Sequence, residues 1–427
     1  NLKAEVVDIA GNKTVINVGS DKLTIDTVIP TISRVESINP GDGSANNGLF
    51  GIDNDINIKF TFSDVVTLTD GVATVGLDVV TAPEIAAADL QGVDNITIPY
   101  TVQENDESLK LAFTGLTLPT GKLRDNAGND MAVFTADTDF SLEDISSVEV
   151  DGIYPVMFTV GSVITKTSNT DDVIADHWDP VTAGYWNSYN DGISITIPIV
   201  ENSNTGGTIK IIGLNITTAE GGGDFATADY VITDADATTG SVVIDISETE
   251  FTETLSGDAT SWYSEGTMVG LSARITDLAG NSRQGNESAT TITIDESAPT
   301  IANYVVSEAI ATGGNIVANY WNSTNTGLDV SVTVQAVDAS VDNGSVRILA
   351  GIGTDAASAA YHQLGDPVAV QPSDNIASGI ILASITEAQV EAQAEYEESK
   401  TINLKAEVVD IAGNKTVINV GSDKLTI

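Results

Sequence analysis

The 427-residue chain contains no cysteine and few basic residues. Without cysteine, neither disulfides nor thiolate metal sites can stabilise it, so bound ions are the expected substitute in an extracellular protein. Its 17 Lys and Arg residues stand against 61 Asp and Glu residues, which gives a formal net charge of −44. Such a charge repels a nucleic-acid backbone and an anionic membrane surface, so we expect neither as a partner. Divalent cations are the natural counterions.

Long apolar runs and catalytic signatures are also missing. No stretch approaches the roughly 20 apolar residues of a membrane helix, so we expect no direct membrane insertion here. The two histidines, His177 and His362, lie far apart and lack a Ser or Cys nucleophile context. Nothing supports a catalytic triad, and we predict a protein that is not an enzyme. Hydrophobic residues still make up 41% of the chain, which is enough for packed cores.

The most informative feature that is present is a perfect duplication. The string NLKAEVVDIAGNKTVINVGSDKLTI at 1–25 recurs unchanged at 403–427, which is a period of 402 residues. Folding constraints fix core and turn residues but not exposed polar ones, so this identity indicates recent duplication or homogenisation within a tandem array. We therefore expect neighbouring copies of the same repeat as partners, with lateral self-association as a further option.

Two short motifs divide the period. The pattern [I/V]-D-x-x-x-P begins at Ile25, Val150 and Ile294, and a D-x-A-G-N pattern precedes each new start. We predict module 1 at 26–150, module 2 at 151–294 and module 3 at 295–427, with 1–25 as the C-terminal hairpin of a preceding module. The D-x-A-G-N segments, called closing turns below, are Asp8–Asn12, Asp125–Asn129, Asp277–Asn281 and Asp410–Asn414.

Within the modules, apolar and polar residues alternate with a period of two, as in 56–62, 193–199 and 328–334. Such alternation predicts half-buried strands. Repeated strands with Gly, Asn and Asp turns predict an all-β fold of tandem immunoglobulin-like antiparallel β-sandwiches arranged end to end. Around the closing turn we expect a hairpin in which Gly11 is left-handed. Helical insertions are expected at 83–90 and at 386–396, where Thr386 and Gln389 fit a capping box.

Modules 2 and 3 share the strings YWNSYNDG (185–192) and YWNSTNTG (320–327), each before an alternating strand. These modules are expected to be diverged duplicates, and module 1 a more distant relative. The shared Trp could stack on sugars, but a Trp before a buried strand more often packs in a core, which we favour.

The combination of D-x-A-G-N turns, I-D-x-x-x-P starts and the stretch FSDVV at 62–66 resembles the bacterial immunoglobulin-like repeats of giant surface adhesins. The resemblance implies a stalk of sandwiches at the cell surface, often with Ca²⁺ at the junctions, that carries a distant adhesive domain. The modules here are longer than the roughly 100 residues usual for the fold, and the helical insertions are atypical.

Calcium sites at the closing turns follow from the topology of such a sandwich, because the first strand begins at the pole where the last turn lies. Ca²⁺ takes six to eight oxygen ligands from carboxylates, amides and backbone. The expected ligands are Asp26, Asp64, Asp125 and Asn129 in module 1, Asp151, Asp277 and Asn281 in module 2, and Asp295, Glu296, Asp410 and Asn414 in module 3. The alternative is that Asp and Asn only cap a tight turn by hydrogen bonds. The segment 53–57 also resembles the start of an EF-hand loop, but a plain surface turn is favoured there because Ile58 replaces the required Gly.

The function predicted from these features is a structural, extracellular or cell-surface array whose repeat is a Ca²⁺-stiffened adhesin stalk. The alternative is a self-assembling extracellular filament or sheath in which 1–25 inserts into another subunit by strand exchange. An isolated hairpin is marginally stable, so 1–25 needs one of these two partners. A ligand-binding module is a third, weaker option.

Overall fold

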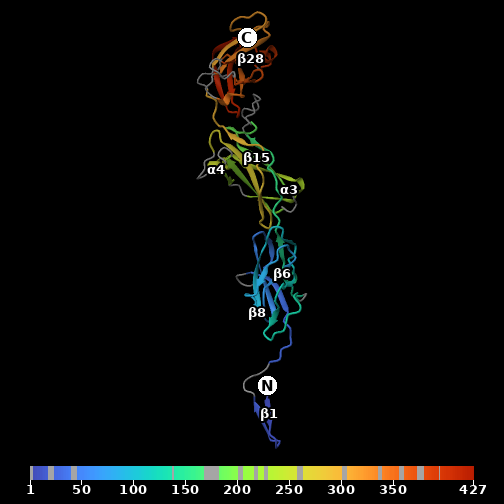
Figure 1. Ribbon diagram of the computed structural model, residues 1–427. Coiled ribbons are helices and arrows are strands. Elements are labelled where there is room, and N and C mark those ends of the chain that lie inside the picture. The colour runs from blue at the N-terminus through green and yellow to red at the C-terminus, as the bar shows by residue number, and fades with distance from the viewer. Residues whose placement is uncertain are drawn as a thin grey trace. The chain divides into compact units, whose positions relative to one another are not determined.

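The computed structural model is nearly all β (Figure 1). Its contacts divide the chain into two compact units, Asn1–Pro155 with Thr276–Ser282, and Val156–Ile275 with Arg283–Ile427. Three separate hydrophobic cores lie within 32–150, 158–294 and 311–425. The structure describes residues 3–17, 24–39, 46–136, 139–167, 182–200, 205–215, 220–225, 229–256, 263–300, 305–334, 339–354, 360–372, 379–393 and 395–427.

The first unit begins with an exposed hairpin. Strands β1 (Lys3–Val7) and β2 (Lys13–Asn17) pair antiparallel, with Lys3 opposite Asn17. Every residue of β1 is exposed, and Val6 keeps 56% of its surface in solvent. The hairpin therefore forms by local pairing and buries none of its β1 side chains.

Module 1 is a β-sandwich around a core that includes Phe60, Tyr100 and Leu123. One sheet contains the 14-residue strand β5 paired with β3, β8 and β11, and the smaller sheets have the orders β10-β6-β7 and β4-β12-β9. In Figure 1, β8 and β6 mark strands of two of these sheets. The elements are β3 (Ile32–Ile38), β4 (Gly48–Gly51), β5 (Asp55–Leu68), β6 (Val72–Leu77), β7 (Glu84–Ala86), β8 (Gln91–Thr101), β9 (Glu107–Ser108), β10 (Phe113–Thr117), β11 (Leu123–Asp125), α1 (Leu142–Ile145) and β12 (Val148–Asp151).

Module 2 encloses a core that includes Trp186, Phe225 and Phe251, mostly within the second unit. Its sheets have the orders β13-β15-β19 and β14-β22-β20-β16-β17, with β18 and β21 on the second. The elements are β13 (Val163–Lys166), β14 (Tyr185–Trp186), β15 (Gly192–Pro198), β16 (Thr208–Asn215), β17 (Glu220–Asp224), β18 (Tyr230–Val231), α3 (Asp234–Thr239), β19 (Ser241–Ser247), α4 (Glu248–Ser256), β20 (Met268–Thr276), β21 (Ser282–Gln284) and β22 (Ile292–Ile294).

Module 3 repeats this plan with sheets β23-β24-β28 and β26-β25-β29-β30, the latter also pairing with β27. Its core includes Trp321, Leu328 and Ile402. The elements are β23 (Val305–Thr312), β24 (Gly327–Val334), the 3-10 helix η2 (Ala339–Val341), β25 (Ser345–Gly353), β26 (Tyr361–Gln363), β27 (Val368–Ala369), β28 (Gly379–Thr386), α5 (Glu387–Glu391), β29 (Thr401–Val409) and β30 (Lys415–Thr426).

The fold class and the alternating strands are confirmed. In β5 the apolar residues from Ile56 to Phe62 are buried and those between them are not, because successive side chains of a strand point to opposite faces. Most pairings are antiparallel, but β12 pairs parallel with β4 and β14 parallel with β22.

One helical expectation is confirmed and the other is wrong. Helix α5 begins after Thr386, whose hydroxyl accepts from Gln389 N while the Gln389 side chain accepts from Thr386 N. It ends at Glu391, earlier than expected. The segment 83–90 is not helical but contains β7, because Glu84, Ile85 and Ala86 pair with the edge of β6. Tertiary pairing overrides weak local helix preference there.

The two tryptophans of the shared YWN strings lie in the cores, as favoured. Trp186 is fully buried and its indole N–H donates to the Tyr263 hydroxyl at 2.9 Å. Trp321 is 2% exposed and donates to the Tyr396 hydroxyl at 2.8 Å. A buried ring has no face for a sugar, whereas the hydrogen bond satisfies the only polar atom of the indole.

Candidate junction sites at the closing turns

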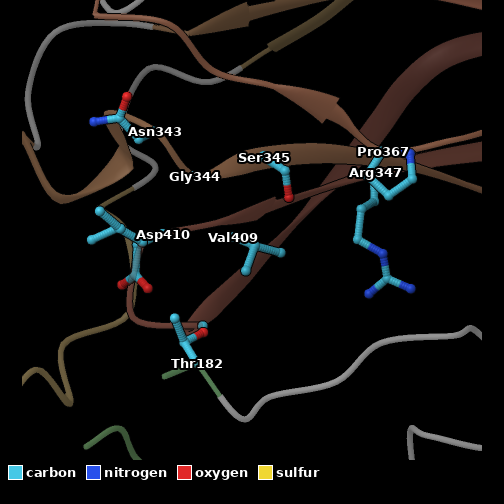
Figure 2. Close-up of a pocket in the computed structure, with 10 residues that line it drawn as sticks. Thr182, Asn343, Gly344, Ser345, Arg347, Pro367, Val409 and Asp410 are labelled. Atoms are coloured by element: carbon cyan, nitrogen blue, oxygen red, sulfur yellow. The ribbon is translucent and has the colours of Figure 1, made fainter. Parts of the chain in front are cut away.

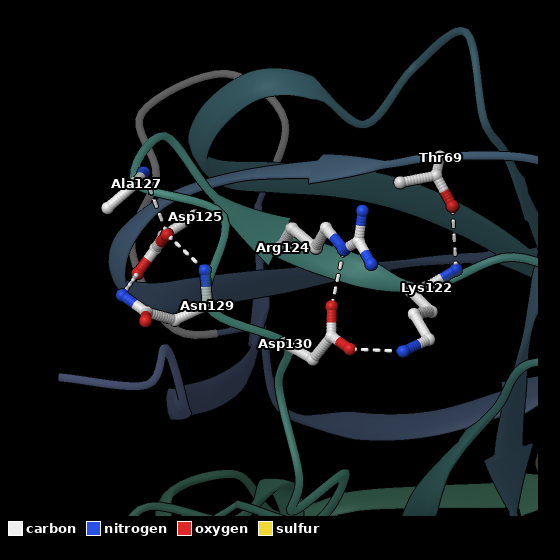
Figure 3. A network of polar contacts seen from close by, with 7 residues as sticks. All are labelled: Thr69, Lys122, Arg124, Asp125, Ala127, Asn129 and Asp130. Atoms are coloured by element: carbon white, nitrogen blue, oxygen red, sulfur yellow. Dashed lines mark hydrogen bonds and ion pairs between the residues drawn. The ribbon is translucent and has the colours of Figure 1, made fainter. Parts of the chain in front are cut away.

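All four closing turns have the same internal geometry. In the turn at 125–129 the Asp125 carboxylate accepts from Ala127 N and from Asn129 N, each at 2.8 Å, and from Asn129 Nδ2 at 2.8 Å (Figure 3). The corresponding Asn N to Asp Oδ1 distances are 2.8, 2.9 and 2.8 Å at Asn12, Asn281 and Asn414. The glycine of each turn is left-handed, with φ between 85° and 97°, as expected for Gly11. These hydrogen bonds are the ones expected if Asp and Asn only cap a tight turn.

In module 1 the structure brings the expected residues together. Asn129 Nδ2 lies 3.4 Å from the Asp26 carbonyl and 3.3 Å from the Val28 carbonyl, so the turn contacts the start of the module. Carboxylate oxygens of Asp26, Asp64 and Asp125 lie within 4.8 Å of one another. Within the described residues, no other acidic or His cluster of this size is as close. Hydrogen bonds from Asn129 lower the pKa of Asp125, so its carboxylate is charged at neutral pH.

Beside this turn lies an ion-pair network that sequence reasoning missed. Asp130 binds both Lys122 and Arg124, while Lys122 N donates to Thr69 Oγ1 at 2.8 Å (Figure 3). The signal was the alternation of Lys122 and Arg124 before the turn, which places both cations on one face of the strand. The network links β11 to the end of β5. It uses the Asp130 carboxylate and leaves those of Asp26, Asp64 and Asp125 unpaired with Lys122 or Arg124.

In module 2 the turn is also tied to the start of the module. Asn281 Nδ2 donates to the Asp151 carbonyl at 2.8 Å and to the Ile153 carbonyl at 3.2 Å. Burial raises the pKa of Asp277, and the nearby Asp151 charge adds to that rise. The Asp151 carboxylate itself accepts from Ile153 N at 3.0 Å. Two carboxylates are therefore near this turn.

In module 3 the structure adds an acid that the sequence did not indicate. Asn414 Nδ2 donates to the Asp295 carbonyl at 2.7 Å, and Asp410 is 3% exposed. Burial raises the pKa of Asp410 to about 6. Burial, a hydrogen bond with Glu265 and the Asp410 charge raise the pKa of Asp295 to about 7. Glu296 instead accepts from the Tyr263 hydroxyl, so Glu265 stands closer to the expected ligand set than Glu296 does.

Two of the turn asparagines, Asn281 and Asn414, also bind backbone outside their own module, which sequence reasoning missed entirely. In the first unit, Ile52 N donates to Asn281 Oδ1 at 2.7 Å. In the second unit, Asn187 Nδ2 donates to the Ala412 carbonyl at 2.6 Å, and Ser188 N and Oγ lie 3.3 and 3.2 Å from Asn414 Oδ1. In each of these two turns, the Asn amide nitrogen donates to a carbonyl at the start of its own module, and the amide oxygen accepts from a loop of the module before it. No local sequence signal shows this, because the partners are more than 200 residues apart.

A cavity of about 300 Å³ lies beside the turn of module 3 (Figure 2). Its charged wall is Arg347, whose Nη1 donates to Glu407 at 2.7 Å; both side chains are almost fully buried. Lys415 lies 3.3 Å from the same carboxylate. The guanidinium is therefore already paired, and the other charged residue of the lining is Asp410 of the closing turn. The lining residues are Thr182, Asn343, Gly344, Ser345, Arg347, Pro367, Val409, Asp410, Ile411 and Gly413.

The histidines remain apart from these sites as far as they are described. His362 lies in β26 opposite Ala350 of β25, and His177 lies outside the described residues. The EF-hand-like segment forms a turn with Asp53 in the left-handed region, followed by β5 from Asp55. The surface turn favoured for this segment agrees with that geometry.

The fold defines this chain as a tandem of immunoglobulin-like β-sandwiches. No protein-family model matches the sequence, and no curated protein matches it. Among solved structures, the FN1–FN3 domains of chicken CNTN1 match 92% of this chain and 100% of their own, at 10% identity and a TM-score of 0.29. A likeness this weak carries no information on function. No helix in the described part of the chain is long and apolar enough to cross a membrane.

Proposed function

We propose that this chain is a non-enzymatic structural repeat of an extracellular surface array, the stalk of an adhesin of the bacterial immunoglobulin-like type. The observation that carries the proposal is the repeated role of the turn asparagine. In all three modules its amide nitrogen binds main-chain carbonyls at the module start, at Asp26 and Val28, Asp151 and Ile153, and Asp295. A linker bonded in this way is shorter and stiffer than a free coil, which suits a spacer.

The second part of the proposal is that Ca²⁺ stiffens these junctions. The support is strongest in module 1, where three carboxylates converge and Asp125 is charged. Like charges this close repel one another, and a divalent cation removes that repulsion while accepting oxygen ligands from all three. In modules 2 and 3, burial raises the pKa values of Asp277, Asp295 and Asp410, and a bound cation would favour the charged forms of these carboxyl groups.

The test compares thermal unfolding of the full chain in EDTA, in 5 mM Ca²⁺ and in 5 mM Mg²⁺. A site with a Kd of about 0.1–1 mM adds about 1–2 kcal/mol at that concentration, so Ca²⁺ should raise the melting temperature of module 1. Asp64→Asn should abolish that rise, because Asp64 bonds only its neighbour Val65 N and contributes nothing to the turn. Asp8→Ala is the control, because the Asp8–Asn12 turn makes the same Asp–Asn hydrogen bonds, is exposed, and lies outside the close acidic group. Equal melting temperatures in EDTA and in Ca²⁺ would show that the closing turns bind no Ca²⁺ and are hydrogen-bonded turns alone.

A second candidate function, a filament assembled by strand exchange, is favoured by the hairpin. Val6, Val15 and Ile16 are 56, 53 and 51% exposed on β1 and β2. In the identical segment, Val408 and Ile418, the counterparts of Val6 and Ile16, are 0 and 7% exposed, whereas Val417, the counterpart of Val15, keeps 42% of its surface in solvent. The hairpin thus presents an apolar face that a second sheet could cover. A filament that disassembles when residues 1–25 are removed would favour this function over the stalk.

A further inference from the structure

In the second unit, a loop of module 2 contacts the closing turn of module 3. A similar loop occurs in module 3, and a similar turn occurs in module 1. The loop Asn187–Asn190 follows β14, and it donates to the turn Asp410–Asn414 through Asn187 and Ser188. Asn187 and Asn414 are both fully buried. Module 2 therefore binds the turn of the module that follows it through neutral polar groups.

Module 3 carries the same loop at Asn322–Asn325. Asn322 N donates to Asn325 Oδ1 at 2.7 Å, the distance also found from Asn187 N to Asn190 Oδ1. Thr324 N donates to Asn322 Oδ1 at 3.0 Å, as Tyr189 N does to Asn187 Oδ1 at 2.9 Å. The internal geometry of the donor loop is thus built twice. The second copy differs at its first residue, because Asn322 is half-buried where Asn187 is fully buried, while Ser188 and Ser323 are both exposed. One Nδ2 hydrogen of Asn322 donates to the Asn315 carbonyl at 2.8 Å, and the amide has a second hydrogen to donate.

The closing turn of module 1 is the matching acceptor. Its hydrogen bonds copy those of the turn at 410–414, but Ala127 is exposed where Ala412 is fully buried. Asn129 is half-buried where Asn414 is fully buried. The same groups that accept in module 3, the alanine carbonyl and the asparagine Oδ1, thus lie on a more exposed turn in module 1.

In a tandem array, module 3 of one copy is followed by module 1 of the next copy, so the loop of module 3 and the closing turn of module 1 are neighbours. Residues 1–25 are identical to the final hairpin of module 3 and run directly into Asp26, so in the proposed array a module of that kind is expected before module 1. We propose that the loop Asn322–Asn325 binds the closing turn Asp125–Asn129 of the next copy of this repeat, with Asn322 Nδ2 donating to the Ala127 carbonyl and Ser323 donating to Asn129 Oδ1. This inference rests on the proposed tandem array and names the surfaces at the joint between periods.

Disulfide trapping tests the contact, and the absence of native cysteine makes it clean. Two full copies are joined so that Asp26 of the second follows Ile427 of the first. Ser323→Cys is placed in the first copy and Ala127→Cys in the second. Under mild oxidation this pair should close at least tenfold faster than a pair of Ser323→Cys with Glu104→Cys. Glu104 is an exposed control at the other end of β5, next to Asn105, which bonds to Gly152.

The pair Ser188→Cys with Ala412→Cys, placed across the contact already seen, sets the rate expected of a true neighbour. Hydrogen exchange provides a second measurement that needs no substitution. The peptide containing Asn322–Asn325 should show two equal populations in the joined protein, one protected, and a single fast population in one copy. A Ser323–Ala127 pair no faster than the Glu104 control, or a single fast population in both proteins, would overturn the contact. Solution scattering of the joined protein tests the stalk separately, because it can remain extended without this contact.

Discussion

Asp8 and Asp410 occupy the same position of identical sequences, yet they differ in ionisation. Asn12 bonds lower the pKa of Asp8, which is exposed in the hairpin. Burial raises the pKa of Asp410 to about 6 although Asn414 makes the same bonds to it. Desolvation disfavours the charged form, and in module 3 it outweighs the hydrogen bonds that favour it. The pKa of the turn Asp is thus determined by how deeply the surrounding protein buries the turn.

The pH dependence of module 3 follows from this difference. Unfolded Asp has a pKa near 3.9, whereas folded Asp410 and Asp295 have pKa values of about 6 and about 7. Between these values the folded state binds more protons, so the contribution of these two groups to stability is greatest below about pH 4 and is lost as pH rises through about 7. After allowance for partial solvent exposure, we expect a loss of about 1–2 kcal/mol between pH 5 and pH 7.5.

Thermal unfolding of the full chain in EDTA at the two pH values measures this loss. Asp295→Asn should flatten the dependence, because an amide keeps the shape of the side chain without titrating. Asp8→Asn should leave it unchanged. A melting temperature of module 3 that rises from pH 5 to pH 7.5 would contradict the assignment.

At the scale of elements, short helices after β19 and β28 are built by the same device. The Ser247 hydroxyl accepts from Glu250 N at 3.3 Å while Glu250 Oε2 accepts from Ser247 N at 3.1 Å, which is the capping box also found at Thr386 and Gln389. The S-x-x-E spacing was visible in the sequence before α4 and predicts this helix. Phe251 and Leu255 of α4 are fully buried in the core of module 2, so the cap orients a core-forming helix.

Removing that cap should weaken module 2 selectively. Ser247→Ala leaves the N-terminal backbone N–H groups of α4 without their acceptor, at a cost of about 1 kcal/mol. Chemical denaturation should show this loss in the transition of module 2 and not in that of module 1. Glu253→Gln, on the exposed face of the same helix, should change stability by no more than about 0.5 kcal/mol. Equal effects of the two changes would mean that the cap contributes nothing.

For the whole molecule, the charge of −44 and the absence of cysteine determine how the array responds to its medium. Like-charged modules repel one another, and at physiological ionic strength this repulsion falls off over about 8 Å. The proline-containing module starts restrict the backbone, and the turn asparagines bind it. Short, bonded junctions in a self-repelling chain favour an extended arrangement.

Solution scattering of the full chain tests that arrangement. We expect an extended particle whose largest dimension is the same in EDTA and Ca²⁺, with a narrower distribution of conformations in Ca²⁺ because bound ions restrict the junctions. Mg²⁺ at equal concentration controls for screening alone. A compact particle under all conditions would rule out the stalk.

The sequence by itself determined the hairpin and its turn. The identical segments at 1–25 and 403–427 have the same register, with Lys3 opposite Asn17 and Lys405 opposite Asn419. Alternation, turn glycine and the Asp–Asn pair are local signals, so they act in any surroundings. The strands of the modules and the capping box at Thr386 were predictable for the same reason.

Only the tertiary structure decided what these local elements do. Val6 is 56% exposed and Val408 fully buried, and Glu5 binds Lys13 at the surface whereas Glu407 binds Arg347 in the interior. The strand at 84–86, the role of Glu265 and the bonds from Ser188 to Asn414 likewise depend on partners far along the chain. Desolvation and packing arise from these distant neighbours, which a short stretch of sequence does not specify.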